Sequence, residues 1–375
     1  MKALRFYGKE DLRLEDLPEP VCGKDQVKVR SNQDEMHIEA NADGYSSGRL
    51  DQLTSASAGL VYLHEYTGGP NLIPVTPHPI TLEKVPLTLG HEFSGTIEEV
   101  GENVTDIKIG DRVVVQPIIY DKTCGACEDG YINCCFSNGF IGLSGWGGGL
   151  SDHCVAPRDT IFKLPDSVSL EIGALVEPLA VAWHAVDMSP LKPGDAVLVL
   201  GGGPIGLAVI QCLKARGVEK IIVSEVAETR KEFAKSFGAH YVFDPRHDDI
   251  VEKCREISPG GGVHVVFDAA GAQAGLDVAI HATRARGTIV NIAVWKNPVK
   301  INPNDLVYKE RTYLGVATYV RGDFANVIDA IASGKIQPEM MITRKIKMDE
   351  IEEKGFKTLV NDKGSHVKIL VEVHP

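Results

Sequence analysis

The sequence has no apolar run of the length that a membrane-spanning helix needs, which is about 20 residues. Positive charge is also in short supply, because 39 Lys and Arg face 51 Asp and Glu and leave a formal net charge of −12. Such a chain is a poor match for a nucleic acid or an anionic membrane surface. The first residues, Met1 to Tyr7, are typical of a strand rather than of a signal or transit peptide. We therefore expect a cytoplasmic protein without a nucleic-acid or membrane partner.

Cysteine is scarce, with eight residues in a chain of 375. Thiols stay reduced in the cytosol, so these cysteines are expected to bind metals or to be inert rather than to form disulfides. The length exceeds that of one typical domain, and two domains are the natural expectation. The composition, with 43% hydrophobic and 24% charged residues, is that of an ordinary globular protein.

Hydrophobic patterning divides the chain into a β-rich part and a part in which strands and helices alternate. The β-rich part has short runs separated by turn residues, at Met1–Tyr7, Leu12–Leu17, Gln26–Arg30, Phe93–Val100, Arg112–Tyr120 and His153–Leu164. From about residue 180 the alternation predicts βαβ units and a parallel sheet, with strands at Ala196–Leu200, Ile221–Ser224, Tyr241–Phe243, Val263–Asp268 and Gly287–Ile292. The last segment, residues 324–375, predicts a helix at Phe324–Ser333 and β structure at Val367–Val373.

A glycine turn stands between a predicted buried strand and a predicted helix. Gly201-x-Gly203-x-x-Gly206 follows the apolar run that ends at Leu200, and Pro204 and Ile205 lie within it. This pattern in this context is typical of a dinucleotide-binding turn, in which the glycines permit the tight turn, the approach of the pyrophosphate and close helix packing. The N–H groups that begin the helix attract phosphate. The alternative is a glycine turn that binds no ligand.

An acidic residue follows at the expected distance. Glu225 ends the next β run about 20 residues on, where a carboxylate accepts hydrogen bonds from the ribose hydroxyls and repels a 2′-phosphate. NAD is therefore favoured over NADP, although Arg230 one helical turn later is a counter-signal. The predicted cofactor-binding residues are Gly201, Gly203, Pro204, Ile205, Gly206, Glu225 and Arg230.

Two groups of side chains offer metal ligands. His91 and Glu92 are adjacent, and Glu177 lies far along the chain among Val, Pro and Leu, where a carboxylate is costly unless it is paired or binds a metal. The alternative for His91 is a hydrogen-bonded core residue. The second group has the Cys-x-x-Cys spacing of zinc sites, and its members are Asp121, Cys124, Cys127 and Cys135, with Cys134 adjacent. The alternative there is a loop of inert thiols.

Together these motifs resemble the zinc-dependent medium-chain alcohol and polyol dehydrogenases. The resemblance covers nearly the whole chain outside residues 31–62 and rests on the segments Gly90-His91-Glu92-Phe93-Ser94-Gly95, Gly110-Asp111-Arg112-Val113, Val176-Glu177-Pro178-Leu179, the cysteine lobe and the glycine turn. The long loop from Gly68 to His91, with Pro77-His78-Pro79, is similar to that of the 2,3-butanediol dehydrogenase branch.

The resemblance implies an α/β fold with a GroES-like β domain, residues 1–180 and 324–375, and a Rossmann domain with a doubly wound parallel sheet, residues 181–323. It implies NAD and zinc as cofactors, a small diol or hydroxyketone as substrate, and a homo-oligomer. The implied activity is oxidation of a secondary alcohol, (R,R)-2,3-butanediol to acetoin, or alternatively of a polyol such as sorbitol or xylitol. The implied roles are catalytic zinc at His91, Glu92 and Glu177, structural zinc at Asp121, Cys124, Cys127 and Cys135, and a proton relay through His64, with Glu92 a ligand or a close neighbour of the metal.

The chain departs from the family between Arg30 and Leu63. Residues 31–62 contain no cysteine, and the positions of the family's zinc Cys, relay Ser or Thr, and Asp hold Gly59, Val61 and Tyr62. The stretch is polar without periodicity, which predicts a loop.

Three hypotheses account for this departure. Part of residues 31–62 derives from an unspliced intron or a misplaced exon boundary, or the stretch is a true insertion with a substitute ligand, or the protein has lost its zinc Cys. The candidates for a substitute ligand are Asp34, Glu35, His37 and Glu39. Because the cofactor segment is intact, we expect retained NAD binding and strongly reduced turnover, and a catalytically dead NAD-binding protein is the alternative of another class.

Overall fold

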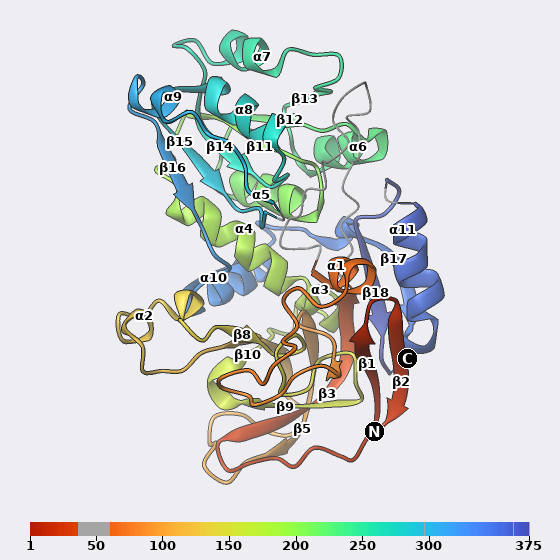
Figure 1. Ribbon diagram of the computed structural model, residues 1–375. Helices are drawn as coiled ribbons and strands as arrows, with labels where there is room; N and C mark the ends of the chain where they lie inside the picture. Colours follow the sequence, from red (N-terminus) through yellow and green to blue (C-terminus); the bar gives the residue numbers. More distant parts are fainter. Residues whose placement is uncertain (37–60, 296, 363, 375) are drawn as a thin grey trace.

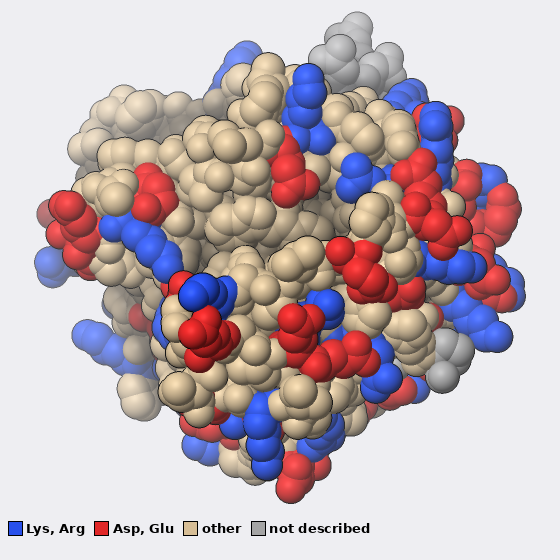
Figure 2. All heavy atoms as spheres, turned by 90° about the horizontal axis from the view of Figure 1, so that it is seen from below, with Lys and Arg blue, Asp and Glu red and all other residues tan. Residues whose placement is uncertain are grey.

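A computed structural model describes residues 1–36, 61–295, 297–362 and 364–374 (Figure 1). The N-terminal part and the C-terminal end build mostly antiparallel β structure in the lower half of Figure 1, with a parallel pair, β17 (Ile342–Lys347) and β18 (Lys368–Glu372), near the C-terminus. The middle of the chain builds a parallel sheet with helices in the upper half. Among the described residues, no helix combines the length and the apolar character needed to span a bilayer. Figure 2 shows acidic and basic side chains intermixed over the face seen from below.

Two sheets build the β-rich half. A small sheet has β1 (Lys2–Gly8) between β2 (Asp11–Asp16) and β4 (Leu87–Thr88). A seven-stranded sheet has the order β10-β6-β5-β3-β18-β17, with β9 also paired to β3. Its strands are β3 (Gln26–Met36), β5 (Phe93–Val100), β6 (Arg112–Val115), β9 (His153–Pro157), β10 (Ile161–Lys163), β17 (Ile342–Lys347) and β18 (Lys368–Glu372). The chain thus returns at its C-terminal end to a sheet that it began near its N-terminus.

The stretch predicted as a loop at residues 31–62 is partly regular, and that prediction is wrong at both of its ends. Strand β3 continues to Met36, where Asp34 pairs with Phe93 and with Val371, because two neighbouring strands supply ladder partners. Helix α1 begins at Val61 and ends at Gly68. The candidate ligands His37 and Glu39, and the side chains of Asp34 and Glu35, lie outside what the structure describes.

The parallel sheet has six strands in the order β13-β12-β11-β14-β15-β16. They are β11 (Ala196–Leu200), β12 (Lys220–Ser224), β13 (Tyr241–Phe243), β14 (Val263–Asp268), β15 (Thr283–Asn291) and β16 (Thr312–Gly315). The order runs outward from β11 in both directions, which is the doubly wound arrangement. The predicted α/β fold with a β-rich part and a doubly wound parallel sheet is therefore confirmed.

Helices cover both faces of this sheet because successive side chains of a strand point to opposite faces. Val197 and Val199 of β11 pack with α4 (Val176–Met188), α5 (Pro204–Ala215), α6 (Glu228–Phe237) and α10 (Arg321–Ala332). Leu198 and Leu200 pack on the other face with α7 (Ile250–Ile257), α8 (Gln273–Ala282) and α9 (Pro303–Val307). The core around α4 and α5 also takes in Val114 and Leu164 of the β-rich half, so apolar packing is continuous between the halves.

Prolines break two of the predicted strands. The run Arg112–Tyr120 forms β6 and the short β7 (Ile118–Ile119), which pairs with β8 (Gly139–Phe140), because Pro117 between them has no N–H to donate. The run His153–Leu164 forms β9, which ends at Pro157, and then β10. The remaining helices are short, at α2 (Gly125–Glu128), α3 (Leu170–Ala174) and α11 (Lys357–Asn361).

Candidate active site

The structure brings together three ligand side chains that are far apart in the sequence. His91 and Glu92 lie in the turn between β4 and β5, where Gly90 adopts a φ of +110° that favours glycine. Glu177 lies in the first turn of α4. One ligand atom from each residue lies within 4.8 Å of the other two, and all three residues are buried. The structure thus brings His91, Glu92 and Glu177 together as predicted. Their role as zinc ligands stays a proposal.

Burial sets the protonation of this cluster. It raises the pKa of Glu177 to about 7, because the charged carboxylate has lost its water. Burial and the nearby ammonium of Lys368 lower the pKa of His91 to about 3, so that the imidazole is neutral near pH 7. A neutral imidazole and two carboxylates within reach of one point are a donor set that suits zinc. A dication there would also offset the charge that burial makes costly.

Three further side chains fix the cluster, and sequence reasoning missed all of them in these roles. Lys368 of β18, fully buried, donates from Nζ to Glu92 Oε2 at 3.0 Å. Tyr319, also fully buried, donates to Glu177 Oε1 at 2.7 Å. These partners lie 276 and 142 residues away from the carboxylates that they hold, and spacing along the chain carries no signal for such contacts.

The third partner is Tyr62, at the start of α1. Its Oη accepts a hydrogen bond from Gly90 N–H at 2.8 Å and forms one of 2.6 Å with His91 Nδ1. The two rings are also in contact, with their centroids 4.9 Å apart. Nδ1 is thereby engaged, and Nε2 lies toward the carboxylates, 3.6 Å from Glu92 Oε1. A metal-binding histidine usually has such a partner on its other nitrogen. The hydroxyl of Tyr62 could be read from the sequence, but its contact with His91 could not.

The proposed relay residue His64 lies on α1, half-buried, two residues after Tyr62, and its carbonyl accepts from the Asn71 amide at 3.2 Å. Its neighbour Glu65 is buried and accepts from the N–H groups of Asn71 and Leu72, at 2.8 Å each. Glu65 therefore anchors the loop after α1, and burial raises the pKa of its carboxyl group. The part of His64 in proton transfer stays a proposal.

The cysteine lobe forms a second cluster. Asp121, Cys124, Cys127 and Cys135 each place one ligand atom within 4.8 Å of the others, whereas the adjacent Cys134 is exposed and is no member of that group. Backbone N–H groups point at the ligands: Cys135 Sγ accepts from Asp121 at 3.3 Å and from Ser137 at 3.4 Å. Hydrogen bonds from the backbone likewise lower the pKa of the Cys124 thiol. Burial raises the pKa of the neighbouring Cys127 thiol to about 12. Three cysteines and one carboxylate within reach of one point are a donor set for a closed structural zinc site, with an oxygen in place of a fourth soft ligand. Their role as zinc ligands stays a proposal.

The glycine turn has the geometry that its spacing predicts. Gly201 has a φ of +92°, and a Cβ on Gly206 would lie 1.9 Å from the Gly201 carbonyl oxygen. Gly203 is the N-cap of α5, with Pro204 and Ile205 in its first turn. Close approach of the helix to the turn therefore requires glycine at position 206, and the free N–H groups of the helix start lie at the carboxyl end of β11. Binding of a dinucleotide by these residues stays a proposal.

Glu225 follows β12, at the same edge of the sheet. Its Oε2 accepts from Gly202 N–H at 2.6 Å, and its Oε1 accepts from Val226 and Ala227 N–H at 2.7 and 2.8 Å. Sequence reasoning missed Gly202, where a Cβ would lie 3.1 Å from this carboxylate. Arg230 is buried in the first turn of α6, with an exposed fraction of 4%.

Comparisons with known proteins agree with this architecture. Residues 63–166 match the model of the alcohol dehydrogenase GroES-like domain, and residues 204–333 match that of the zinc-binding dehydrogenases. The (R,R)-butanediol dehydrogenase of Bacillus subtilis (strain 168) is 41% identical over 372 residues, 99% of each chain. That of Saccharomyces cerevisiae (strain ATCC 204508 / S288c) is 36% identical over 395 residues, 99% of this chain and 98% of the relative.

Solved structures show the same fold. The crystal structure of 2R,3R-butanediol dehydrogenase from Bacillus subtilis matches with a TM-score of 0.88 and 39% identity, covering 100% of this chain and 99% of that one. A chain from Sinorhizobium meliloti 1021, described as a zinc-binding dehydrogenase and bound to NADP, has a TM-score of 0.82 and 29% identity over 99% of both chains. With two family models matched and a relative this similar over its whole length, the chain belongs to the zinc-binding dehydrogenases that carry an alcohol dehydrogenase GroES-like domain.

Proposed function

We propose that the chain is a zinc- and NAD-dependent secondary alcohol dehydrogenase that interconverts (R,R)-2,3-butanediol and acetoin. The observation that carries the proposal is the buried group of His91, Glu92 and Glu177, in a chain that also has a complete glycine turn. Its full-length relatives named (R,R)-butanediol dehydrogenase support the choice of substrate.

In this proposal the three residues hold zinc, which when bound polarises a substrate hydroxyl as a Lewis acid. The protein supplies the arrangement of the ligands. Tyr62 holds His91 through Nδ1, Tyr319 holds one oxygen of Glu177, and Lys368 holds one oxygen of Glu92. The three partners are themselves buried, which excludes water from this side of the cluster. At the cofactor turn, the N–H groups that begin α5 bind the pyrophosphate.

The missing cysteine and hydroxyl bear on the rate rather than on cofactor binding. Val61 cannot pass a proton, and a site of one imidazole and two carboxylates binds zinc more weakly than one with a thiolate. His64 is the relay residue in this proposal, and Val61 stands before it where the family has a Ser or Thr. We therefore expect saturable NAD binding with slow turnover, and restoring a short Cys-Gly-Thr-Asp segment before Leu63 should raise the rate.

The test of the activity is a parallel assay of NADH formation with (R,R)-2,3-butanediol, sorbitol and xylitol, together with zinc analysis of the purified protein. Faster oxidation of the butanediol supports the proposal, and faster oxidation of sorbitol or xylitol replaces it with the polyol alternative. That alternative has support in a relative from Aspergillus clavatus named "Probable D-xylulose reductase A", 36% identical over 289 residues, 74% of this chain. NAD binding without turnover, even in the restored variant, would leave a catalytically dead NAD-binding protein.

The origin of residues 31–62 has a direct test in the mature transcript. If the message encodes Cys-Gly-Ser/Thr-Asp shortly before Leu63, the hypothesis of an unspliced intron or a misplaced exon boundary is correct. If the message encodes the printed stretch, a substitute ligand or a lost cysteine is left. We further propose a homo-oligomer in the cytoplasm, which sedimentation and cell fractionation would test.

A further inference from the structure

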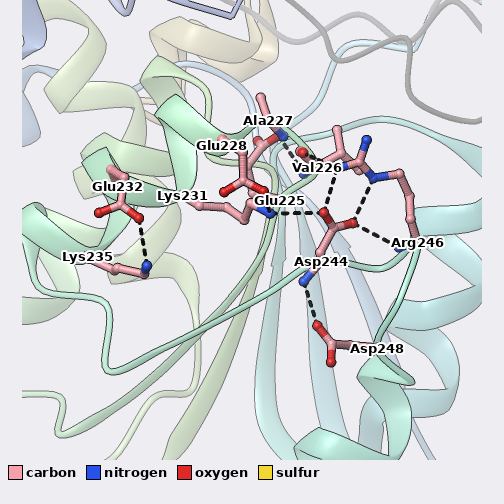
Figure 3. A network of polar contacts seen from close by, with 10 residues as sticks. All are labelled: Glu225, Val226, Ala227, Glu228, Lys231, Glu232, Lys235, Asp244, Arg246 and Asp248. Carbon is pink, nitrogen blue, oxygen red and sulfur yellow. Dashed lines mark hydrogen bonds and ion pairs between the residues drawn. The ribbon is translucent and has the colours of Figure 1, made fainter.

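Two acidic residues stand at the carboxyl ends of neighbouring parallel strands, beside the glycine turn. Glu225 follows β12 and Asp244 follows β13, and the N–H of Glu225 donates to the Phe243 carbonyl at 3.0 Å. Ligands of open parallel sheets bind at this edge. Figure 3 shows the two carboxylates with Lys231 and Arg246.

The carboxylate of Glu225 has little capacity left for a ligand. Oε1 accepts two backbone N–H groups and Oε2 accepts one. A carboxylate oxygen accepts about two hydrogen bonds, so Oε2 retains one position for a ribose hydroxyl. Glu225 thus binds a hydroxyl through one oxygen and repels a phosphate by its charge.

Two cations lie next to Glu225, and both are bound to Asp244. Arg246 Nη2 donates to the carbonyl of Val226, the residue after Glu225, at 2.7 Å. The same guanidinium binds Asp244 in a bidentate manner, Nε to Oδ1 at 2.9 Å and Nη2 to Oδ2 at 2.6 Å. Lys231 Nζ binds Asp244 Oδ2 at 3.0 Å and Glu228 Oε1 at 2.6 Å.

The position of Arg246 makes this pairing relevant to the cofactor. Its side chain is 41% exposed, whereas that of Asp244 is only 8% exposed, so the guanidinium lies at the surface where a ligand would arrive. Nε and Nη2, which form one of the two bidentate edges of a guanidinium, both face Asp244. The second N–H of Nη2 donates to Val226, so the other edge, Nη1 with Nη2, is left with only the N–H groups of Nη1. The Arg246 guanidinium in turn holds the pKa of the Asp244 carboxyl well below its usual range.

The charges of this group oppose a second phosphate. Glu225, Glu228 and Asp244 carry three negative charges and Lys231 and Arg246 two positive ones, which leaves −1. Asp248 and Arg230, which also lie beside this group, add one charge of each sign and leave the sum unchanged. A 2′-phosphate would add negative charge beside Glu225 and would find the nearby guanidinium engaged. An arginine in this place is the residue that accommodates a 2′-phosphate in NADP-binding sheets.

We propose that Asp244 is a specificity-determining residue for the cofactor: it holds the Arg246 guanidinium so that it does not receive a 2′-phosphate. Rejection of NADP then has two parts, repulsion by Glu225 and withdrawal of the arginine by Asp244. The inference rests on the proposed dinucleotide site and adds a second determinant to it.

The test compares ADP-ribose with 2′-phospho-ADP-ribose, titrated calorimetrically into the full chain. Neither ligand carries nicotinamide, so neither zinc nor turnover enters the measurement. We expect the wild-type protein to prefer ADP-ribose and Glu225→Gln to reduce that preference. Adding Asp244→Asn to Glu225→Gln should reduce it by a further tenfold or more, about the value of one hydrogen bond to a charged group.

Two matched controls separate contact from charge. Asp248→Asn removes the same charge from the same segment, and Asp248 binds the Asp244 N–H at 2.9 Å. Glu225→Gln with Asp248→Asn should therefore resemble Glu225→Gln alone. Adding Arg246→Gln to the pair of Glu225→Gln and Asp244→Asn should abolish the gain in affinity for 2′-phospho-ADP-ribose that Asp244→Asn brings.

The inference is overturned if affinity for 2′-phospho-ADP-ribose also rises with Asp248→Asn, if the rise survives Arg246→Gln, or if Asp244→Asn brings no rise.

A second comparison needs no change at Asp244. In the Glu225→Gln background, Arg246→Gln should change binding of the 2′-phosphate less than about twofold, because Asp244 still holds the arginine. A larger loss would show that Arg246 already binds the phosphate, and would also overturn the inference. If the wild-type protein binds no ADP-ribose at all, the proposed dinucleotide site itself falls.

Discussion

At the scale of single residues, the metal-ligand cluster depends on side chains that serve other side chains. His91, Glu92 and Glu177 each have a buried partner, and the three partners come from α1, from β18 and from the loop between β16 and α10. Buried polar groups are costly without such partners. The cluster is therefore held in place before any metal binds, and its stability can be tested separately from activity.

Replacing Tyr62 by Phe tests the partner of His91. The change removes the hydroxyl that binds Nδ1 and keeps the ring that packs on the imidazole. We expect zinc affinity, measured by competition with a chromogenic chelator, to fall by about 10-fold or more. Tyr66→Phe on the same helix is the control, because its hydroxyl binds Glu352 instead. Equal affinities in the wild-type protein and Tyr62→Phe would contradict the orienting role.

Replacing Lys368 by Met tests the partner of Glu92. The change removes the ammonium group that donates to the buried Glu92 carboxylate, and breaking such a pair costs about 3 kcal/mol or more in the free energy of unfolding. Urea denaturation of the zinc-free protein measures this loss, and adding Glu92→Gln should recover most of it. Lys28→Met removes a more exposed pair with Glu99 and should cost less than about 1 kcal/mol. A loss of similar size in both single variants would argue against a special role for the buried pair.

The grouping of His91, Glu92 and Glu177 could be predicted from the sequence, but the side chains that hold these three residues could not. His91 and Glu92 are adjacent, and Glu177 is conspicuous as a charge in an apolar run, so local pattern singles them out. Lys368 is one lysine among many in the printed sequence, and only the pairing of β18 with β3 brings it beside Glu92. Tyr62 stands where the family has an acidic residue, and only the fold shows that its hydroxyl reaches His91.

At the scale of elements, the glycine turn and α5 form a unit in which one atom decides the fit. Gly206 lies under the Gly201 carbonyl, so the helix can approach the turn only without a side chain at this position. The N–H groups of the helix start are useful to a phosphate only at that distance. In the proposed function, the geometry of the turn therefore links helix packing to cofactor binding.

Replacing Gly206 by Ala should weaken NAD binding by about 10-fold or more, because a Cβ 1.9 Å from the Gly201 oxygen forces the backbone apart. Fluorescence titration with NADH measures the affinity. The matched control is Gly275→Ala in α8, where the nearest atom to the new Cβ, Leu200 Cδ1, is 3.8 Å away. Gly275→Ala should keep the wild-type affinity, and a loss shared by both variants would point to general destabilisation instead.

Strands β11 and β14 have the predicted bounds because they are largely apolar runs between turn residues. Strand β16 (Thr312–Gly315) was missed, and β15 begins at Thr283 rather than at the predicted Gly287, because Thr283–Arg286 is not an apolar run. The extension of β3 to Met36 could not, because Ser31–Met36 is polar and its pairing comes from strands β5 and β18. The end of β6 follows from Pro117, whose missing N–H was visible in the sequence but was outweighed by the apolar run around it.

At the scale of the whole molecule, the two metal-ligand clusters lie on different parts of the chain and should bind independently. The ligands of the cysteine lobe all come from residues 121–135, whereas the other cluster joins residues 91, 92 and 177. A structural zinc site stabilises its own segment first. Loss of the lobe's metal should therefore leave the cofactor site intact.

Replacing Cys135 by Ser should lower the zinc content of the purified protein from two ions per chain to one, as measured by atomic emission. The melting temperature should fall, whereas the affinity for ADP-ribose should not change. Cys134→Ser is the control, because this exposed thiol lies next to Cys135 but outside the cluster. An unchanged zinc content in Cys135→Ser would show that the lobe holds no metal.

The packing of α4 against α5 also limits where two related sequences can be recombined into a chimera. Glu177 is on α4, and the cofactor turn opens α5, and one apolar core contains both helices together with α10 and Val114 and Leu164 of the β-rich half. A crossover between two relatives placed at the loop from Ser189 to Asp195 would divide this core between two parents. Each half would then meet side chains of different volume, and a misfit of even one methylene is felt in a close-packed interior. A chimera of two relatives joined at this loop should therefore fold well only if the core residues of α4 and α5 come from the same parent.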